Sequence, residues 1–328
     1  MSKPESVPHQ SARQARSRWI RFALTALNVA LFVFFAHWLI RNISLHVFAE
    51  YFSVIPAWAI LGSVLINFGA LILYGLRMKF ILHERYWISF SVINIGYGLN
   101  TIIPLRLGEA VKIVMAHRLY GIPAMRLVAA SFLEKLVDLF KLLVLGIILV
   151  AFAAGRFINA GLLVTPFVLI VGALGAVFIF RLVVFHIDKI FPAGSRLRRI
   201  LLEVHKHTTE YPLARILSVT VVIWSLNVLL MYFSFNTYLG NIEFTLWDSI
   251  ALLLLLAMAI AMPSAPASIG LFEATIVAYL TQFLAVNNEA ALAAAVVFHL
   301  AISVPQLAYL GITLLQHRMR AASKLPGL

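Results

Sequence analysis

The chain has 328 residues, of which 62% are hydrophobic and 12% are charged, and its formal net charge is +13. Soluble domains are roughly half apolar and about a quarter charged, so this composition excludes an ordinary soluble protein and indicates that lipid surrounds most of the chain. The absence of cysteine excludes disulfides, thiolate nucleophiles and thiolate metal sites.

The positive charge lies in the segments between apolar runs. Basic residues precede the first run, follow the second, fill a central loop and end the chain: Lys3, Arg13, Arg16, Arg18, Arg21, Arg77, Lys79, Arg85, Lys189, Arg196, Arg198, Arg199, Lys206, Arg318, Arg320 and Lys324. This placement follows the positive-inside rule and favours contact with anionic lipid headgroups. It argues against nucleic acid as a partner, which would need one basic patch or stripe.

The first half begins with a basic tail and two spans, predicted at residues 1–18, 19–41 and 54–76. The second span returns the chain to the cytoplasm at Arg77. The next apolar run, 88–103, is short and rich in Gly and Asn, and the residues after it are too densely charged to face lipid. Basic residues flank this segment on both sides, so we expect 88–118 to form a re-entrant hairpin.

The first half ends with a third span, predicted at 127–153, and the second half repeats this order of elements. A span, a basic loop and a further span are predicted at 158–186, 187–212 and 213–238. The apolar run that follows breaks between Pro263 and Gly270 and then resumes. We expect 247–284 to form a second re-entrant hairpin, which enters from the outside. The last span, 289–316, then leads to a cytoplasmic tail at 317–328.

The element order predicts an all-α polytopic membrane protein with about six full spans and two re-entrant helical hairpins. One transmembrane domain, 19–316, contains an inverted repeat of residues 19–153 and 158–316. Inverted repeats with helices broken at mid-depth are typical of transporters, although enzymes also adopt them. We expect a multi-pass protein of the bacterial inner membrane with both termini in the cytoplasm.

The first break carries the strongest motif, which consists of Asn100, Pro104, Arg106, Gly108, Glu109 and Lys112. Pro104 and Gly108 permit unwound backbone and are the predicted hinges. Arg106 offers a bidentate donor fork for phosphate or carboxylate, and Glu109 and Lys112 lie on one helical face. The alternative is an amphipathic helix that lies on the headgroups.

Charged residues in the third predicted span form a second group. Glu134, Asp138 and Lys141 lie on one face, with Lys135 adjacent. A charge at the bilayer centre costs about 3 kcal/mol or more, so these residues must pair, face water or stay near the interface. Pairing with Arg106 or Lys112 would close one network. That network either pins the hairpin to the span or handles substrate or protons.

The second break contributes the third group of candidates. Pro263, Pro266 and Gly270 are its predicted hinges, and Ser268 and Glu273 are its polar side chains. His299 and Gln306 are seven residues apart on the last span, so they share a face that can point toward this break. The alternative for His299 is a hydrogen-bonded packing residue.

The sequence has no phosphate-binding GxxxxGK[ST] loop, dinucleotide GxGxxG motif, zinc HExxH motif or GxSxG elbow. The histidines show no metal-site spacing beyond the His205-x-His207 pair. We therefore expect no cofactor and no bound metal.

At the three groups of residues the chain resembles the flippase-like membrane domain of lysylphosphatidylglycerol synthase, the multiple peptide resistance factor family, and its stand-alone relatives. The resemblance covers about residues 20 to 316. Lys112 and Lys135 stand where the family favours arginine, and His299 lies near a position that is often basic. The resemblance implies a lipid flippase or carrier, and the chain end at residue 328 implies no aminoacyl-transferase domain.

The resulting hypothesis is movement of a phospholipid or a polyprenyl-phosphate-linked lipid between leaflets. The alternatives are a membrane-embedded transferase and a non-catalytic partner in lipid or glycolipid biosynthesis. Partners would be membrane lipids with anionic or phosphate headgroups, a second copy of the chain, or a lipid-synthesis enzyme. The predicted substrate-binding residues are Asn100, Arg106, Glu109, Lys112, Glu134, Lys135, Asp138, Ser268, Glu273 and His299.

Overall fold

The computed structural model describes residues 44–103, 107–157, 212–240, 242–261 and 266–322, and the single positions or pairs 37, 192, 194–195, 198–199 and 201–202. These residues are helical and include no strand, which confirms the all-α class. The predicted tail 1–18 and fourth span 158–186 lie outside the described residues. The first predicted span, 19–41, is described only at position 37.

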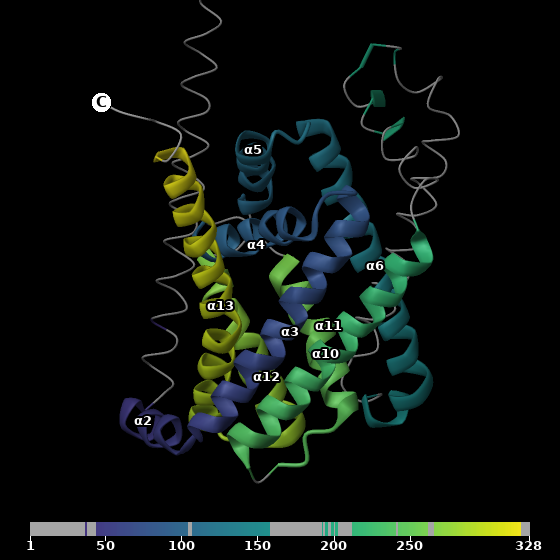
Figure 1. The fold of residues 1–328 in the computed structure, drawn as a ribbon. Helices are drawn as coiled ribbons and strands as arrows, with labels where there is room; N and C mark the ends of the chain where they lie inside the picture. The colour runs from purple at the N-terminus through teal and green to yellow at the C-terminus, as the bar shows by residue number, and fades with distance from the viewer. Residues whose placement is uncertain are drawn as a thin grey trace, which may run out of the picture.

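The structure comprises long helices and two pairs of shorter ones (Figure 1). The elements are α2 (Leu45–Val54), α3 (Ala57–Leu82), α4 (Tyr86–Ile102), α5 (Gly108–Tyr120), α6 (Ala124–Phe157), α10 (Leu213–Leu239), α11 (Leu246–Ala261), the 3-10 turn η3 (Pro266–Ser268), α12 (Leu271–Leu284) and α13 (Asn288–Ala322). Helix α5 lies at one end of the molecule and α2 at the other (Figure 1). Helices α3 and α10 cross between them and pack against each other.

Four segments are long and apolar enough to cross a membrane: 57–82, 213–239, 266–284 and 288–316. Three of them correspond to predicted spans, and they coincide with α3, α10 and most of α13. Helix α6 has 34 residues and contains the predicted span 127–153, but it is not among these four segments. The protein is therefore a multi-pass membrane protein, while the full number of spans stays a prediction.

Helices α4 and α5 form an antiparallel hairpin. A Cβ atom on Gly108 would collide with Asn100, and one on Gly96 would lie 2.7 Å from Cδ of Lys112, so residues on either side of the turn face each other in reverse order. With 17 and 13 residues, the helices are about 26 and 20 Å long, short of a hydrocarbon core of about 30 Å. Their length and direction fit the predicted re-entrant hairpin.

The second break also divides two short helices. Ala267, Ser268 and Gly270 have φ angles of 54°, 60° and 86°, in the left-handed region that ends a continuous helix. Helix α12 therefore begins at Leu271 and has 14 residues, about 21 Å. It packs against α11, and the Tyr279 hydroxyl donates to Asp248 over 2.8 Å. The break lies where the second predicted hairpin places it, whereas the re-entrant character of this hairpin and the inverted relation of the two halves stay predictions.

Proline at position 305 interrupts the hydrogen bonds of α13 without ending the helix. Because Pro305 has no N–H, the carbonyl of Ala301 has no partner within the helix. Nδ2 of Asn67 on α3 lies 3.4 Å from this oxygen and 3.2 Å from the carbonyl oxygen of Ile302. The buried amide therefore satisfies the freed carbonyl and ties α3 to α13, as lipid-embedded backbone requires.

The largest apolar core lies between α10, α11, α12 and α13, and it includes the aromatic residues Phe235, Phe244, Phe272 and Phe298. Helix α4 runs against α3, α13, α5 and η3. The 3-10 turn of the second break therefore packs on helix α4 of the first hairpin.

Candidate functional site

Arg77 lies inside helix α3, and its side chain is only 1% exposed. The prediction that the second span ends at residue 76 and that Arg77 begins a cytoplasmic loop was wrong. Helix α3 continues to Leu82, because the apolar residues 78, 80, 81 and 82 extend its buried face past the arginine. The guanidinium group lies 5.1 Å from the ring centre of Tyr74, one turn earlier.

Arg77 binds two carboxylates of α6. Its Nη1 lies 2.6 Å from Oδ1 of Asp138, and its Nη2 lies 3.4 Å from Oε1 of Glu134. The two acids are four residues apart and so lie on one face of α6. Glu134 is fully buried and Asp138 is 25% exposed, so the arginine supplies the charge that a buried carboxylate needs.

Lys112 joins the first hairpin to the same face of α6. Its ammonium group is 1% exposed and lies 3.4 Å from Oε2 of Glu134 and 2.5 Å from Oε2 of Glu109. The lysine side chain passes over Gly96 of α4, where any larger residue would block it. The predicted pairing of Lys112 with the third span is confirmed, and so is the meeting of Glu109 and Lys112 on one helical face.

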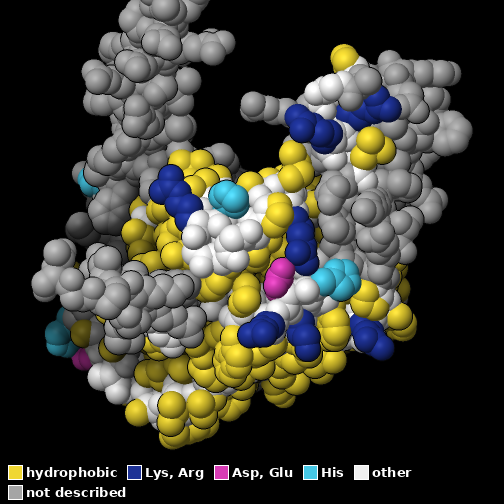
Figure 2. Space-filling view, turned by 45° about the horizontal axis from the view of Figure 1, so that its top comes forward, with side chains coloured by type: hydrophobic (Ala, Val, Ile, Leu, Met, Phe, Trp, Pro, Cys, Tyr) yellow, Lys and Arg dark blue, Asp and Glu magenta, His cyan; other side chains and the backbone are white. Residues whose placement is uncertain are grey.

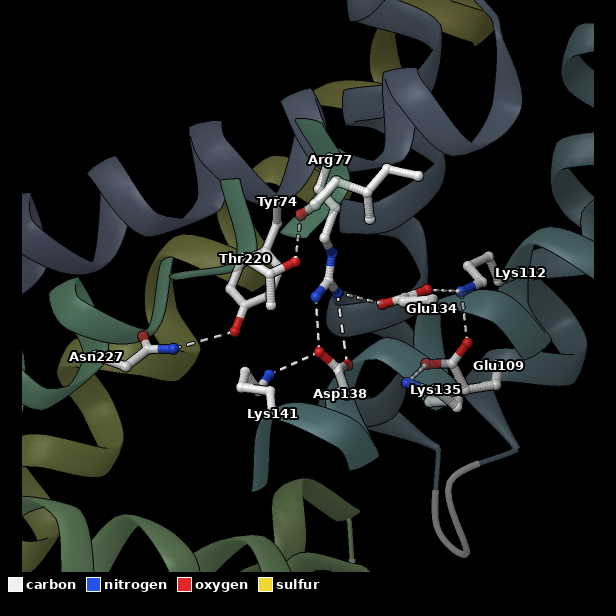
Figure 3. A network of polar contacts seen from close by, with 11 residues as sticks. Tyr74, Arg77, Glu109, Lys112, Glu134, Lys135, Asp138, Lys141, Thr220 and Asn227 are labelled. Carbon is white, nitrogen blue, oxygen red and sulfur yellow. Dashed lines mark hydrogen bonds and ion pairs between the residues drawn. The ribbon is translucent and has the colours of Figure 1, made fainter. Parts of the chain in front are cut away.

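Seven side chains of α3, α5 and α6 form one row of ion pairs, which we name the charge chain (Figure 3). Nζ of Lys135 lies 3.0 Å from Glu109, and Nζ of Lys141 lies 2.7 Å from Asp138 and 3.6 Å from the ring centre of Trp224. The signs alternate along the chain, in the order Lys141, Asp138, Arg77, Glu134, Lys112, Glu109 and Lys135. A lysine occupies each end.

The charge chain contains four cations and three carboxylates, so its formal charge is +1. Each carboxylate has two cationic partners, an arrangement that offsets the cost of removing charge from water. Lys135 is 53% exposed, whereas Lys141 at the other end is 8% exposed. The surplus positive charge can therefore meet a soluble or lipid-borne anion at the Lys135 end.

Glu273 and His299 form a second buried group. Nδ1 of His299 lies 2.5 Å from Oε1 of Glu273, and the ring centres of His299 and Phe272 are 4.4 Å apart. The second carboxylate oxygen of Glu273 accepts a hydrogen bond of 2.7 Å from the backbone N–H of Gly270. Glu273 thus caps the first turn of α12, where a negative charge is favourable.

The predicted face of α13 does point toward the breaks. His299 meets Glu273 of the second break, and Oε1 of Gln306 accepts a hydrogen bond of 3.4 Å from Thr101 of α4. Ser268 is buried within the turn. Pro266 begins η3 and Gly270 ends the turn, as predicted hinges should, whereas Pro263 lies outside the described residues.

The predicted residues therefore fall into two groups. Among the described residues no ion pair joins the charge chain to the pair of Glu273 and His299. Asn100 belongs to neither group; its side-chain oxygen is buried without a hydrogen-bond partner and faces Gly108. Pro104 and Arg106 lie outside the described residues. Within the described part of the chain, no three acidic or histidine side chains come close enough to hold a metal.

The chain matches the model of a membrane-protein family over most of its length. The model of the lysylphosphatidylglycerol synthase TM region matches residues 19–309. The chain belongs to this family. Comparison with the curated proteins gave no match. Membership in the lysylphosphatidylglycerol synthase TM family confirms the resemblance seen in the sequence and connects the protein with membrane lipids.

Arg77 is the residue of this site that sequence reasoning missed. The signal that could have found it is the apolar run of residues 78 and 80–82, which continues the helical face beyond the charge. An arginine that has apolar residues of the same helical face before and after it lies inside the helix. A charged residue inside a membrane helix is functional by default.

The end of the molecule that carries α5 is mainly apolar, with separate Lys, Arg and His side chains on it and few acidic ones (Figure 2). Basic side chains at a membrane surface favour contact with anionic headgroups in general. The exposed lysine of the charge chain belongs to α6, beside α5, so an anion drawn to this end would meet it.

Proposed function

We propose that this protein moves an amphiphilic lipid with an anionic, phosphate-bearing headgroup between the two leaflets of its membrane. The observation that carries this proposal is the charge chain, a buried row of ion pairs between the first hairpin and α6 that has one surplus positive charge and one exposed end. Membership in a lipid-related membrane family supports it.

The headgroup first meets the ammonium group of Lys135. This lysine has Glu109 as its partner, and a phosphate oxygen competes with that carboxylate for the same donor. Glu109 can then pair with Lys112 alone, which it already contacts at 2.5 Å. The bound anion neutralises the surplus charge of the charge chain at its exposed end.

Ion pairs of the charge chain also hold the hairpin of α4 and α5 against α6. Lys112 and Glu109 belong to α5, whereas Glu134 and Lys135 belong to α6. An anion that replaces Glu109 at Lys135 weakens one of these two links. Headgroup binding and hairpin movement are thereby coupled, while the lipid tails stay in the bilayer along apolar outer faces such as those of Leu61, Leu65 and Val221.

Several finer assignments belong to this proposal. We assign the substrate-binding role to Lys135, Glu109 and Lys112, together with Asn100 of α4 and Arg106. We assign the protein no catalytic residue, a bacterial inner membrane location and cytoplasmic termini, the last on the basis of the basic loops.

The test uses liposomes that contain the purified protein and a fluorescent lipid. One set carries a labelled phospholipid and the other a labelled polyprenyl phosphate, and a membrane-impermeant quencher reports the fraction of label in the outer leaflet. The native protein should accelerate the exchange of one lipid class over protein-free liposomes. Lys135→Gln should slow this exchange by at least about tenfold, since a charge-assisted hydrogen bond contributes about 1.5–3 kcal/mol.

The matched control is Lys79→Gln, which removes an exposed lysine of α3 that lies outside the charge chain. It should retain the native rate. Unchanged leaflet distribution of both lipid classes would refute lipid movement. Equal rates for Lys135→Gln and the native protein would refute the assigned site.

A further inference from the structure

Glu273 and His299 can exist in two charge states that differ by one proton. With a neutral imidazole the pair has a net charge of −1, and one further proton on the imidazole makes the pair neutral. Nδ1 of the ring is engaged with the carboxylate, so the nitrogen that takes up the proton is Nε2. Both side chains are about nine-tenths buried, at 12% and 11% exposure, so this change of charge occurs away from bulk water.

The carboxylate that would sense this proton also holds a strained turn. Glu273 accepts from Gly270, and Gly270 ends a turn in which Ala267 and Ser268 also have positive φ angles. Non-glycine residues in this region are strained and persist only when their surroundings fix them. The hydrogen bond from Gly270 is one such constraint, and the carboxylate of Glu273 holds it less strongly when it also pairs with a cationic imidazole.

The strained turn lies against the first hairpin, because η3 packs on α4. Helix α4 in turn packs on α5, which supplies Lys112 and Glu109 to the charge chain. A displacement of the turn is therefore transmitted to the hairpin through one helix. No ion pair between the two groups is needed for this coupling.

On the helices that pack against α12 and α13, no other titratable side chain bonds to this pair in the described part of the chain. Helix α4 has only the tyrosines 86 and 97, and on α11 Asp248 accepts from Thr245 and Tyr279. The other titratable residues with described side chains on α2, α3, α10 and α13 are His46, Glu50, Tyr51, Tyr74, Arg77, Lys79, Arg215, Tyr232, Tyr238, Glu289 and Tyr309. None of them bonds to Glu273 or His299 in the described part of the chain.

The geometry points to a proton-binding site formed by Glu273 and His299, whose occupancy sets the conformation of the turn at 267–270 and drives or gates lipid movement through α4. The coupling to lipid movement rests on the proposed function, whereas the proton-dependent change of the turn does not. The ligand is a hydrogen ion from the aqueous side, which binds at Nε2 and leaves from it.

The test measures the turn directly. The chain has no cysteine, so Ile102→Cys on α4 and Ile269→Cys in the turn provide two unique sites for nitroxide labels. Both isoleucines are exposed, at 56% and 44%. Pulsed electron paramagnetic resonance on the full chain in lipid nanodiscs should show a label-to-label distance that differs between pH 5 and pH 8 by about 5 Å, one helical turn.

Two variants and one control identify the proton site. Glu273→Gln and His299→Gln should each fix one distance at both pH values, and the second keeps the proposal testable if the first does not fold. The control is the double variant of His46→Gln and Glu50→Gln, which removes the exposed histidine–glutamate pair of α2, 85% and 64% exposed. It should keep the native shift.

Each outcome decides one question. A native distance that is the same at pH 5 and pH 8, or a Glu273→Gln protein that shifts like the native one, would overturn the proton site. Lipid exchange in liposomes is then measured at the same two pH values; native exchange should differ at least threefold, and that of Glu273→Gln should not. A distance shift without any lipid exchange would leave the proton site standing and refute the proposed function.

Discussion

Arg77 of α3 and Asp138 of α6 form an ion pair of 2.6 Å, in which the arginine side chain is 1% exposed. The pair fixes the central member of the charge chain, because the same guanidinium group also reaches Glu134. Arg77 thus joins α3 to α6, two helices far apart in the sequence, near the middle of the charge chain. The consequence is that loss of Arg77 leaves two carboxylates short of a partner.

Arg77→Gln should therefore lower the free energy of unfolding by about 3–5 kcal/mol, the cost of leaving a buried charge without its partner. Thermal unfolding in detergent measures the effect. Lys79→Gln, two residues further along the same helix and exposed, should change stability by less than about 1 kcal/mol.

A double-mutant cycle separates the pair from the general loss of a charge. Asp138→Asn alone should also destabilise, and the double variant of Arg77→Gln and Asp138→Asn should cost clearly less than the sum of the single ones. Strict additivity of the two changes in unfolding free energy would show that the ion pair contributes nothing.

Gly96→Ala should destabilise the protein by about 1–3 kcal/mol, since the added methyl group would lie 2.7 Å from Cδ of Lys112 and force that side chain off its path. The same change at Gly69, where a Cβ would meet no atom within 4 Å, should be neutral or slightly stabilising in a helix. Equal melting temperatures for both variants would contradict this packing.

Asn67→Leu should cost about 1–3 kcal/mol, because the carbonyl of Ala301 loses its hydrogen-bond donor. Adding Pro305→Ala to this variant should restore part of the stability, since the new N–H at position 305 can satisfy that carbonyl within α13. Thermal unfolding of the single and the double variant measures the difference in their stability. A further loss in the double variant would mean that Pro305 is required for another reason.

Lys135→Gln should leave stability nearly unchanged, within about 1 kcal/mol, because its ammonium group is 53% exposed and its ion pair is screened by water. Its proposed effect on lipid exchange would then be separate from folding. A large drop in melting temperature would show that Lys135 acts mainly as a structural residue.

The sequence was sufficient to predict contacts that follow from helical spacing. Glu109 and Lys112 on one turn, and Glu134 with Asp138 on one face, follow from a period of 3.6 residues. A pairing of α6 with Arg106 or Lys112 was predicted because charges in lipid must find partners, and Lys112 makes it. Pro and Gly were likewise enough to place the second helix break.

Contacts between distant helices could not be predicted in the same way. The partner of Glu273 is 26 residues away, and only the packing of α12 on α13 brings His299 to it. Arg77 was misplaced because the positive-inside rule assigns a basic residue at the end of an apolar run to a loop. That rule describes loops on average, whereas the partners on α6 that keep this arginine buried are separated from it by 57 and 61 residues.

The alternation of signs in the charge chain constrains how this site can change over generations. Exchange of a lysine for arginine at positions 112 or 135 keeps the order of signs, so such exchanges can accumulate one at a time. Reversal or loss of any inner charge leaves both of its neighbours mismatched in a medium that does not screen them. Inner positions of the chain should therefore covary among descendants, with compensating substitutions on α3, α5 and α6 inherited together.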